Sequence, residues 1–426
     1  MKTLAFFLAL LPTAAFAQRL HMTIDDPNFK PYPIAIAEVT DLSNSAAART
    51  QATEMTNTLR ADLEFSPLFL PLNPKSFLAS QREPWTAPHY QDWTNVGASG
   101  LVRAGLTAAN STVTFKFYDV TGQREALSKT YAVSDARHVA HMFADELVKY
   151  LTGIDGVFST RLTFTVHEGA NSNIWITDFD GSNAKRVTKN GVINLLPSWD
   201  RSGKGVFFTT YLQDNPDLYL VDVGSLAVKP VSAQRGLNTG AAISPDGKKI
   251  ALTLSRDGNS EIYVMSRDGK DLKRLTENWW IDTSPTWSPD GTQIAYVSTK
   301  TGNPHIYVMN ADGSNQHRIT FQGNYNQTPD WSPRGTDIAF TARDERYRFD
   351  IFTVDVNTHE IKRLTQDQGN NEEPSYSPDG RLVAFTSNRQ GVRKVFVMGA
   401  DGTKQRMVYS ASGECETPAW SPRTSE

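Results

Sequence analysis

Two short stretches carry side chains whose types and spacing could bind a metal ion. His138, His141 and Asp145 stand at i, i+3 and i+7 in a stretch with helical periodicity, so they could share one helix face. No fourth ligand is apparent, and a solvated helix face is the favoured interpretation. Asp178-Phe-Asp-Gly181 begins like a calcium-binding loop. Similar Asp-Gly pairs recur at the same place in later repeats, which favours a hairpin turn.

The remaining candidate residues do not form a recognisable catalytic arrangement in the sequence. Glu372 and Glu373 are adjacent, so as strand residues they should face opposite sides, a poor arrangement for a general acid/base pair. The sequence contains no Gly-x-Ser-x-Gly, His-Glu-x-x-His or Walker motif. The single cysteine, Cys415, could be a reactive thiol, but its place in a predicted strand favours a small buried residue. We therefore expect no catalytic residues, no metal and no cofactor.

A repeated phrase, Pro-x-Trp-Ser-Pro-Asp-Gly, determines the expected fold. Its third position returns at intervals of 44, 44, 44, 45 and 44 residues. The copies are Pro197–Gly203, Ala241–Gly247, Pro285–Gly291, Pro329–Gly335, Pro374–Gly380 and the truncated Pro418–Arg423. A period of about 40–45 residues with several short strands per unit is typical of a β-propeller blade.

Each repeat divides into four short strands, of which the aromatic phrase is the first. The second, third and fourth strands each occur six times, beginning at Arg161, but the last copy of the first strand ends the chain. The blade that opens at residues 161–190 therefore lacks its inner strand, and Glu414–Ser421 should supply it. We predict an all-β six-bladed propeller closed by strand exchange between its N- and C-terminal segments.

Four segments make up the 426-residue chain. Residues 1–17 resemble a signal peptide, since Leu4–Leu11 is apolar and Ala15-Phe-Ala17 is a small-x-small cleavage site. The apolar run is too short to cross a bilayer, so we expect export to the periplasm and cleavage after Ala17. A polar N-terminal segment (18–32), an α/β domain (33–156) and the propeller (157–426) follow. Segment 18–32 is either a frayed terminus or a peptide that docks in alternative places.

The α/β domain is expected from mixed patterns before the repeats. Strands are predicted over Pro33–Val39, Leu101–Gly105, Thr112–Val120 and Leu127–Val133, and helices over Ser43–Leu63 and from a cap at Asp135 through Tyr150. Phe65–Phe77, with three prolines, is expected to be irregular. The net charge of −3 argues against nucleic acid or an anionic membrane as a general partner, and we expect no direct membrane insertion.

The loops that precede the first strands differ most between blades. Propeller topology places them, with the hairpins joining second and third strands, on one face around the central channel. They are rich in amides, acids and a few aromatics, which suits hydrogen bonding to a polypeptide; ordinary polar loops are the alternative. The loops are Gly236–Gly240, Asn278–Thr283, Gln322–Gln327, Gly369–Glu373 and Ser412–Glu416.

In its order of parts the chain resembles the TolB family, the periplasmic component of the Tol–Pal envelope system. The stretch Leu151–Arg161 resembles the family's domain junction, and Ile24-Asp25 and Pro33–Ile36 resemble its start. The resemblance implies a non-enzymatic scaffold that supports outer-membrane integrity and constriction during cell division. It implies binding of the peptidoglycan-associated lipoprotein Pal to the propeller face, and of the inner-membrane protein TolA to the N-terminal segment. The alternative class is a propeller hydrolase or lyase that acts on an envelope glycan or peptide.

Mapping by motif position gives the expected contact residues. The resemblance places Pal contacts at Leu237, Asn238, Thr239, Gly240, Asp282 and Thr283. The corresponding loops of later blades add Tyr325, Asn326, Glu372 and Glu373, and the N-terminal segment adds Ile24 and Asp25.

Overall fold

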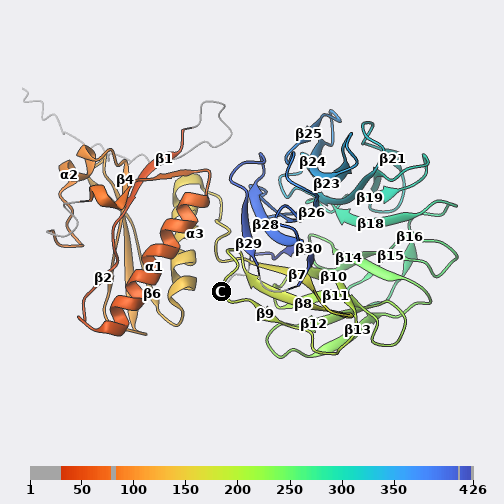
Figure 1. The fold of residues 1–426 in the computed structure, drawn as a ribbon, viewed down its shortest axis with the longest axis horizontal. Helices are drawn as coiled ribbons and strands as arrows, with labels where there is room; N and C mark the ends of the chain where they lie inside the picture. The colour runs from red at the N-terminus through yellow and green to blue at the C-terminus, as the bar shows by residue number, and fades with distance from the viewer. Residues whose placement is uncertain (1–29, 78–82, 411–412, 424–426) are drawn as a thin grey trace, which may run out of the picture.

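The chain forms a mixed α/β domain beside a β-propeller (Figure 1). The computed structural model describes residues 30–77, 83–410 and 413–423. The predicted signal peptide and most of segment 18–32, including Ile24 and Asp25, lie outside the described residues. Among those described, no helix combines the length and apolar character needed to cross a membrane.

The N-terminal domain is built on one sheet with strand order β3-β1-β4-β5-β6, and β2 pairs with β4. The strands are β1 (Tyr32–Ile36), β2 (Thr40–Asp41), β3 (Phe69–Pro71), β4 (Gly100–Leu106), β5 (Thr112–Asp119) and β6 (Arg124–Ala132). Side chains alternate between two cores. Ile34 and Ile36 lie with α1 (Ala46–Phe65) and α3 (Ala136–Thr152), whereas Ala35 lies in a smaller core with Trp93 of α2 (Tyr90–Asn95).

Local sequence signals place both long helices correctly. The Asp135 carboxylate accepts hydrogen bonds from the first turn of α3, as predicted. At the start of α1 the Ser45 hydroxyl accepts a hydrogen bond from the Ala48 amide, a cap that was not predicted. The expectation that Phe65–Phe77 is wholly irregular is wrong, because Phe69–Pro71 forms β3 and Pro74–Ser76 forms a 3₁₀ turn. Strand β3 exists because it pairs in parallel with β1, and a local pattern does not reveal such a distant partner.

The propeller consists of six four-stranded antiparallel sheets, as predicted. Blade 1 contains β30 (Cys415–Trp420), β7 (Arg161–Glu168), β8 (Asn171–Asp178) and β9 (Lys185–Arg186). Blade 2 contains β10 (Asn194–Trp199), β11 (Gly205–Thr210), β12 (Asp217–Asp222) and β13 (Val228–Ser232). Blade 3 contains β14 (Asn238–Ile243), β15 (Lys249–Leu254), β16 (Glu261–Ser266) and β17 (Lys273–Arg274).

The remaining blades repeat the arrangement. Blade 4 contains β18 (Asp282–Trp287), β19 (Gln293–Ser298), β20 (His305–Asn310) and β21 (His317–Arg318). Blade 5 contains β22 (Asn326–Trp331), β23 (Asp337–Arg343), β24 (Phe349–Asp355) and β25 (Ile361–Arg363). Blade 6 contains β26 (Asn371–Tyr376), β27 (Leu382–Ser387), β28 (Lys394–Gly399) and β29 (Arg406–Tyr409). Blade 1 therefore joins the last strand of the chain to the first strands of the propeller.

Every inner strand is interrupted at its third residue. The register shifts there, and the backbone takes a positive φ at Leu196, Gly240, Ser284, Thr328, Glu373 and Thr417. A bulge of this kind bends a strand and re-aims a side chain. In this propeller all six bulge residues line the mouth of the channel at one end.

Candidate protein-binding face

One face of the propeller carries most of its exposed apolar surface. We define the loop face as the loops that precede the inner strands, the first three residues of those strands and the hairpins that join second and third strands. Sixteen large apolar side chains are exposed among the described residues, and eleven of them lie on the loop face. These are Ile193, Leu196, Tyr211, Leu212, Leu237, Trp279, Trp280, Ile281, Phe321, Tyr347 and Val392. Such clustering on one side of a soluble domain is typical of an interaction surface.

The first residues of three inner strands support this face from beneath. Asn238, Asp282 and Asn326 are buried. The Asn238 amide donates to the carbonyls of Gln234 (2.7 Å) and Gly236 (2.9 Å), and the Asn326 amide donates to Gln322 (3.1 Å). These three predicted contact residues therefore hold their loops in place, and their side chains are not available to a partner. The three residues are 44 positions apart, so the repeat places them at equivalent positions. The sequence does not show whether such a polar side chain holds its loop or is exposed.

Other predicted residues do reach the surface. Leu237 is 37% exposed, and Thr239, Gly240 and Thr283 are half-buried at the channel mouth. That mouth is a cavity of about 220 Å³. Tyr325 lies under the guanidinium of Arg343, 4.9 Å from the ring centroid. Small and hydroxyl side chains therefore form the mouth, and exposed apolar side chains lie in the loops around it.

Glu372 and Glu373 contact different neighbours. A guanidinium nitrogen of Arg393 lies 3.4 Å from Glu372 and another lies 2.7 Å from Glu416. The Glu373 carboxylate instead accepts hydrogen bonds from the Thr417 amide (2.6 Å) and the Thr386 hydroxyl (3.1 Å). Burial, opposed by these hydrogen bonds, raises the pKa of Glu373 to about 7. The two carboxyls do not converge on a shared point.

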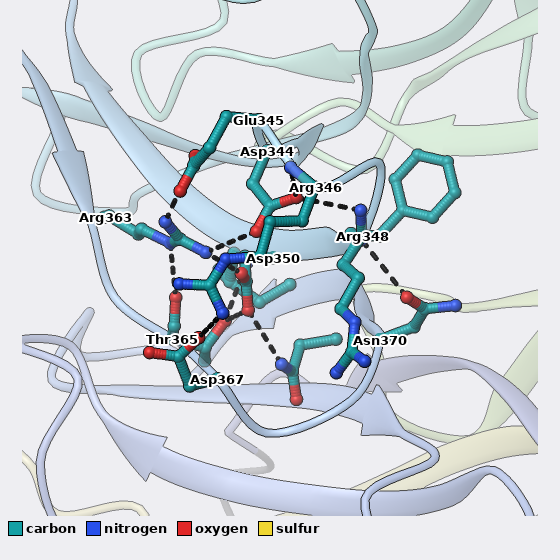
Figure 2. Close-up of polar contacts among 12 residues, drawn as sticks. Asp344, Glu345, Arg346, Arg348, Asp350, Arg363, Thr365, Asp367 and Asn370 are labelled. Atoms are coloured by element: carbon teal, nitrogen blue, oxygen red, sulfur yellow. Dashed lines mark hydrogen bonds and ion pairs between the residues drawn. The ribbon is translucent and has the colours of Figure 1, made fainter.

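An ion-pair network fixes the hairpin 343–349 of blade 5 on this face (Figure 2). The Arg363 guanidinium contacts Asp344 at 2.9 Å and Asp350 at 2.5 Å. The Thr365 hydroxyl donates to Asp350 at 2.6 Å, and Arg346 pairs with Asp367 at 2.6 Å. This network was not predicted from the sequence. An acidic residue at the start of the third strand, together with Arg-x-Thr in the fourth, is the signal that was missed.

The three residues of α3 that were considered as metal ligands do not form a shared site. The Nδ1 atom of His141 lies 2.7 Å from the Asp62 carboxylate of α1, while Asp145 accepts hydrogen bonds from the Phe158 and Ser159 amides. The favoured interpretation, a solvated face, is also wrong, because His141 is buried against Phe179 and Asp180 of the propeller. Burial raises the pKa of Asp62 to about 6 despite the adjacent imidazole, and the Asp62 carboxylate raises the pKa of His141 against desolvation.

The calcium-like stretch is a hairpin turn, as predicted. The Gly181 amide donates to the Asp178 carbonyl at 2.9 Å, and the Asp180 carboxylate accepts from the Ser182 amide and also contacts Arg137. Among the residues that the structure describes, no three His, Cys, Asp or Glu side chains are placed to hold a metal ion.

Comparison with known proteins agrees with this architecture. A family model described as the TolB beta propeller domain matches residues 148–425, and one described as the TolB amino-terminal domain matches residues 20–126. The chain belongs to the TolB family. Its resemblance to TolB, the predicted six-bladed propeller and the preceding α/β domain are thereby confirmed.

Relatives and solved structures give the extent of the similarity. The Tol-Pal system protein TolB of Anaeromyxobacter dehalogenans is 42% identical over 214 residues, which cover 49% of this chain and 48% of the relative. That of Myxococcus xanthus is 42% identical over 210 residues, covering 48% of each. The matched segments thus span about half the length of these curated relatives. The crystal structure of TolB from Acinetobacter baumannii is 27% identical, with a TM-score of 0.80, and covers 95% of this chain and 100% of that one.

Proposed function

We propose that this protein is a non-enzymatic binding component of the Tol–Pal envelope system, whose loop face binds a Pal-type peptidoglycan-associated lipoprotein. The concentration of exposed apolar side chains on the loop face carries the proposal. Its TolB relatives, which are named as Tol-Pal system proteins, support it. We further propose that the protein is exported to the periplasm through residues 1–17, and that segment 18–32 binds a TolA-type inner-membrane protein.

The geometry of the channel mouth favours binding over catalysis. An enzyme of the propeller class would use carboxyls that converge on a substrate, and Glu372 and Glu373 hold different partners instead. The mouth is formed largely by Thr, Ser, Gly and Pro residues. These groups complement a polypeptide surface through shape and hydrogen bonds.

A charge placed at the mouth tests the binding face. Thr283→Arg puts a long cation on a half-buried position beside the channel, whereas Lys362→Ala changes an exposed residue of the outer strand β25. The first variant should weaken binding of the lipoprotein's soluble domain at least tenfold, because a partner cannot approach the mouth without burying the charge. The second should bind as the unchanged protein does, and both should melt normally. Equal effects on affinity from the two variants would mean that the face is wrong.

The N-terminal segment is tested separately by removing residues 18–30. These residues precede β1, so their removal leaves every described strand in place. We expect binding of the TolA-type partner to be abolished and the affinity for the lipoprotein to change, since one segment that docks in two states couples the two equilibria. Calorimetry with each partner decides, and unchanged affinity for both would reduce the segment to a passive tail.

A further inference from the structure

The loop before β18 differs from its counterparts in exposing three consecutive apolar side chains. Trp279 is 96% exposed, Ile281 is 52% exposed and Trp280 is 40% exposed. A tryptophan displayed almost completely to water is unusual, because burying its side chain removes about 150–250 Å² of surface from solvent. The corresponding loops of the other blades are predominantly polar or contain fewer consecutive apolar residues.

The backbone of this loop is held rigidly despite its exposure. The side-chain amide of Asn259 donates to the backbone carbonyls of Asn278 (2.9 Å) and Trp280 (2.5 Å). The Trp280 amide donates to the Asn278 side chain at 2.8 Å, and the Ile281 amide donates to the Thr299 hydroxyl at 2.9 Å. Hydrogen bonds from neighbouring hairpins thus fix the loop on both sides of Trp279.

The buried side of the loop is equally well anchored. The backbone amide of Asn278 donates to the Glu261 carboxylate at 2.8 Å. Glu261 is fully buried and forms an ion pair with Arg274 at 3.0 Å. The Asn278 side chain also donates to Asp282 at 2.8 Å. A loop ordered in advance loses little conformational entropy when a partner binds, and a rigid aromatic side chain at such a site is typical of a binding hot spot.

The charges around the loop indicate the kind of partner. Four charged residues lie in this loop and in the two hairpins that hydrogen-bond to it. The cations are Arg256 and Lys300, and the anions are Asp257 and Glu277. Two cations and two anions give no net attraction to an anionic membrane, which binds surfaces rich in Lys and Arg. An apolar pocket on a folded protein, with mixed charges at its rim, is the complementary surface.

From these observations we propose that Trp279, flanked by Trp280 and Ile281, is a preformed anchor that inserts into an apolar pocket of the folded periplasmic domain of the Pal-type lipoprotein. This inference rests on the proposed function and specifies the contact that dominates its affinity. Thr283 lines the channel mouth and follows Ile281 by two residues, so the loop that carries the anchor leads directly into the strand at the mouth.

The test compares single substitutions in the full-length mature protein. Trp279→Ala should weaken binding of the lipoprotein's soluble domain at least 30-fold, equivalent to about 2 kcal/mol, and Trp279→Phe should recover part of the loss. Both variants should melt as the unchanged protein does, because the side chain touches little of its own protein. Val228→Ala provides the matched control, since Val228 is an exposed apolar residue of β13 away from the loop face. It should bind normally.

Fluorescence gives a second, independent result. The difference between the emission of the unchanged protein and that of Trp279→Phe isolates Trp279, and it should shift to the blue when the lipoprotein domain is added. Affinity of Trp279→Ala within threefold of the unchanged protein would overturn the anchor while leaving the proposed function intact. No binding by the unchanged protein would instead overturn the proposed function. A blue shift with phosphatidylcholine vesicles, and none with the lipoprotein, would identify a membrane contact and overturn the inference.

Discussion

Closure of the propeller through blade 1 predicts a large stability loss when β30 is damaged. Strand β30 pairs with β7 from Cys415 opposite Val166 to Trp420 opposite Leu162, so the two partners are about 250 residues apart in sequence. The Trp420 indole donates to the Thr160 hydroxyl at 2.7 Å, and the Arg161 amide donates to the Ser421 hydroxyl at 2.9 Å. These contacts join the last residues of the chain to the beginning of the propeller.

The size of the effect follows from the burial of Trp420, which is 7% exposed. Truncating a buried tryptophan to alanine costs about 3–5 kcal/mol, against a total stability of roughly 5–15 kcal/mol for a typical protein. Trp420→Ala should therefore fold but unfold at clearly lower denaturant. Deleting residues 414–426 removes all of β30, exposes the edge of β7 and should abolish cooperative unfolding or cause aggregation.

Urea unfolding followed by circular dichroism measures both variants. Trp331→Ala is the matched control, because Trp331 occupies the equivalent position of blade 5 with 6% exposure, but its indole donates within its own blade to Gly335. We expect Trp420→Ala to be at least as destabilising as Trp331→Ala. The role of terminal pairing in closure would be refuted if the deletion variant unfolded like the full chain. It would also be refuted if Trp420→Ala lowered the free energy of unfolding by less than about 1 kcal/mol, since truncations of buried tryptophans cost about 3–5 kcal/mol.

Two further predictions concern buried ionisable groups. The pKa of Glu373 is raised to about 7, chiefly by burial, so the folded state disfavours its charged form and loses stability as the pH rises from about 4.5 to 7. Glu373→Gln carries no ionisable group at this position, so its melting temperature minus that of the unchanged protein should increase between pH 5 and pH 8. Substitution of an exposed residue, Glu360→Gln, is the control and should show no such trend. A melting-temperature difference for Glu373→Gln that does not change with pH would contradict the assignment. Cys415 is fully buried, and burial raises its thiol pKa to about 11. It should react with a thiol reagent only after unfolding in urea, whereas rapid reaction in native buffer would show that the strand opens.

Much of the propeller was predictable because its information is local and repeated. The aromatic phrase, the Ser-Pro-Asp-Gly turn and the apolar second strand recur in each blade, and six consistent copies outweigh irregularities in any one. In blade 2, for example, Asp200-Arg-Ser-Gly203 replaces the usual turn sequence, and the Gly203 amide still donates to the Asp200 carbonyl at 2.9 Å. The helix caps at Ser45 and Asp135 are local in the same sense.

The candidate face was predictable only as a set of loops. Position in the repeat selected residues 236–240 and 278–283 as candidate contacts, but it did not separate Asn238, which is buried, from Thr239, which is only half-buried. The difference arises because the Asn238 side chain points toward the preceding blade, where it contacts Ser232 and Asp217 and donates to carbonyls of its own loop. Trp279 was included only as one of the aromatic residues of these loops, because the exposure of an apolar loop residue depends on where its neighbours lie.

The sequence by itself therefore determined the number of blades, the order of their strands and the presence of a separate α/β domain, because turns and alternating apolar residues act over a few positions. Tertiary structure alone decided which polar residues support loops and which side chains are exposed. It also showed that His141, which the sequence placed on a solvated helix face, is buried and contacts Asp62, 79 positions away. Burial and pairing of this kind depend on which distant elements share a core, and no local pattern encodes that.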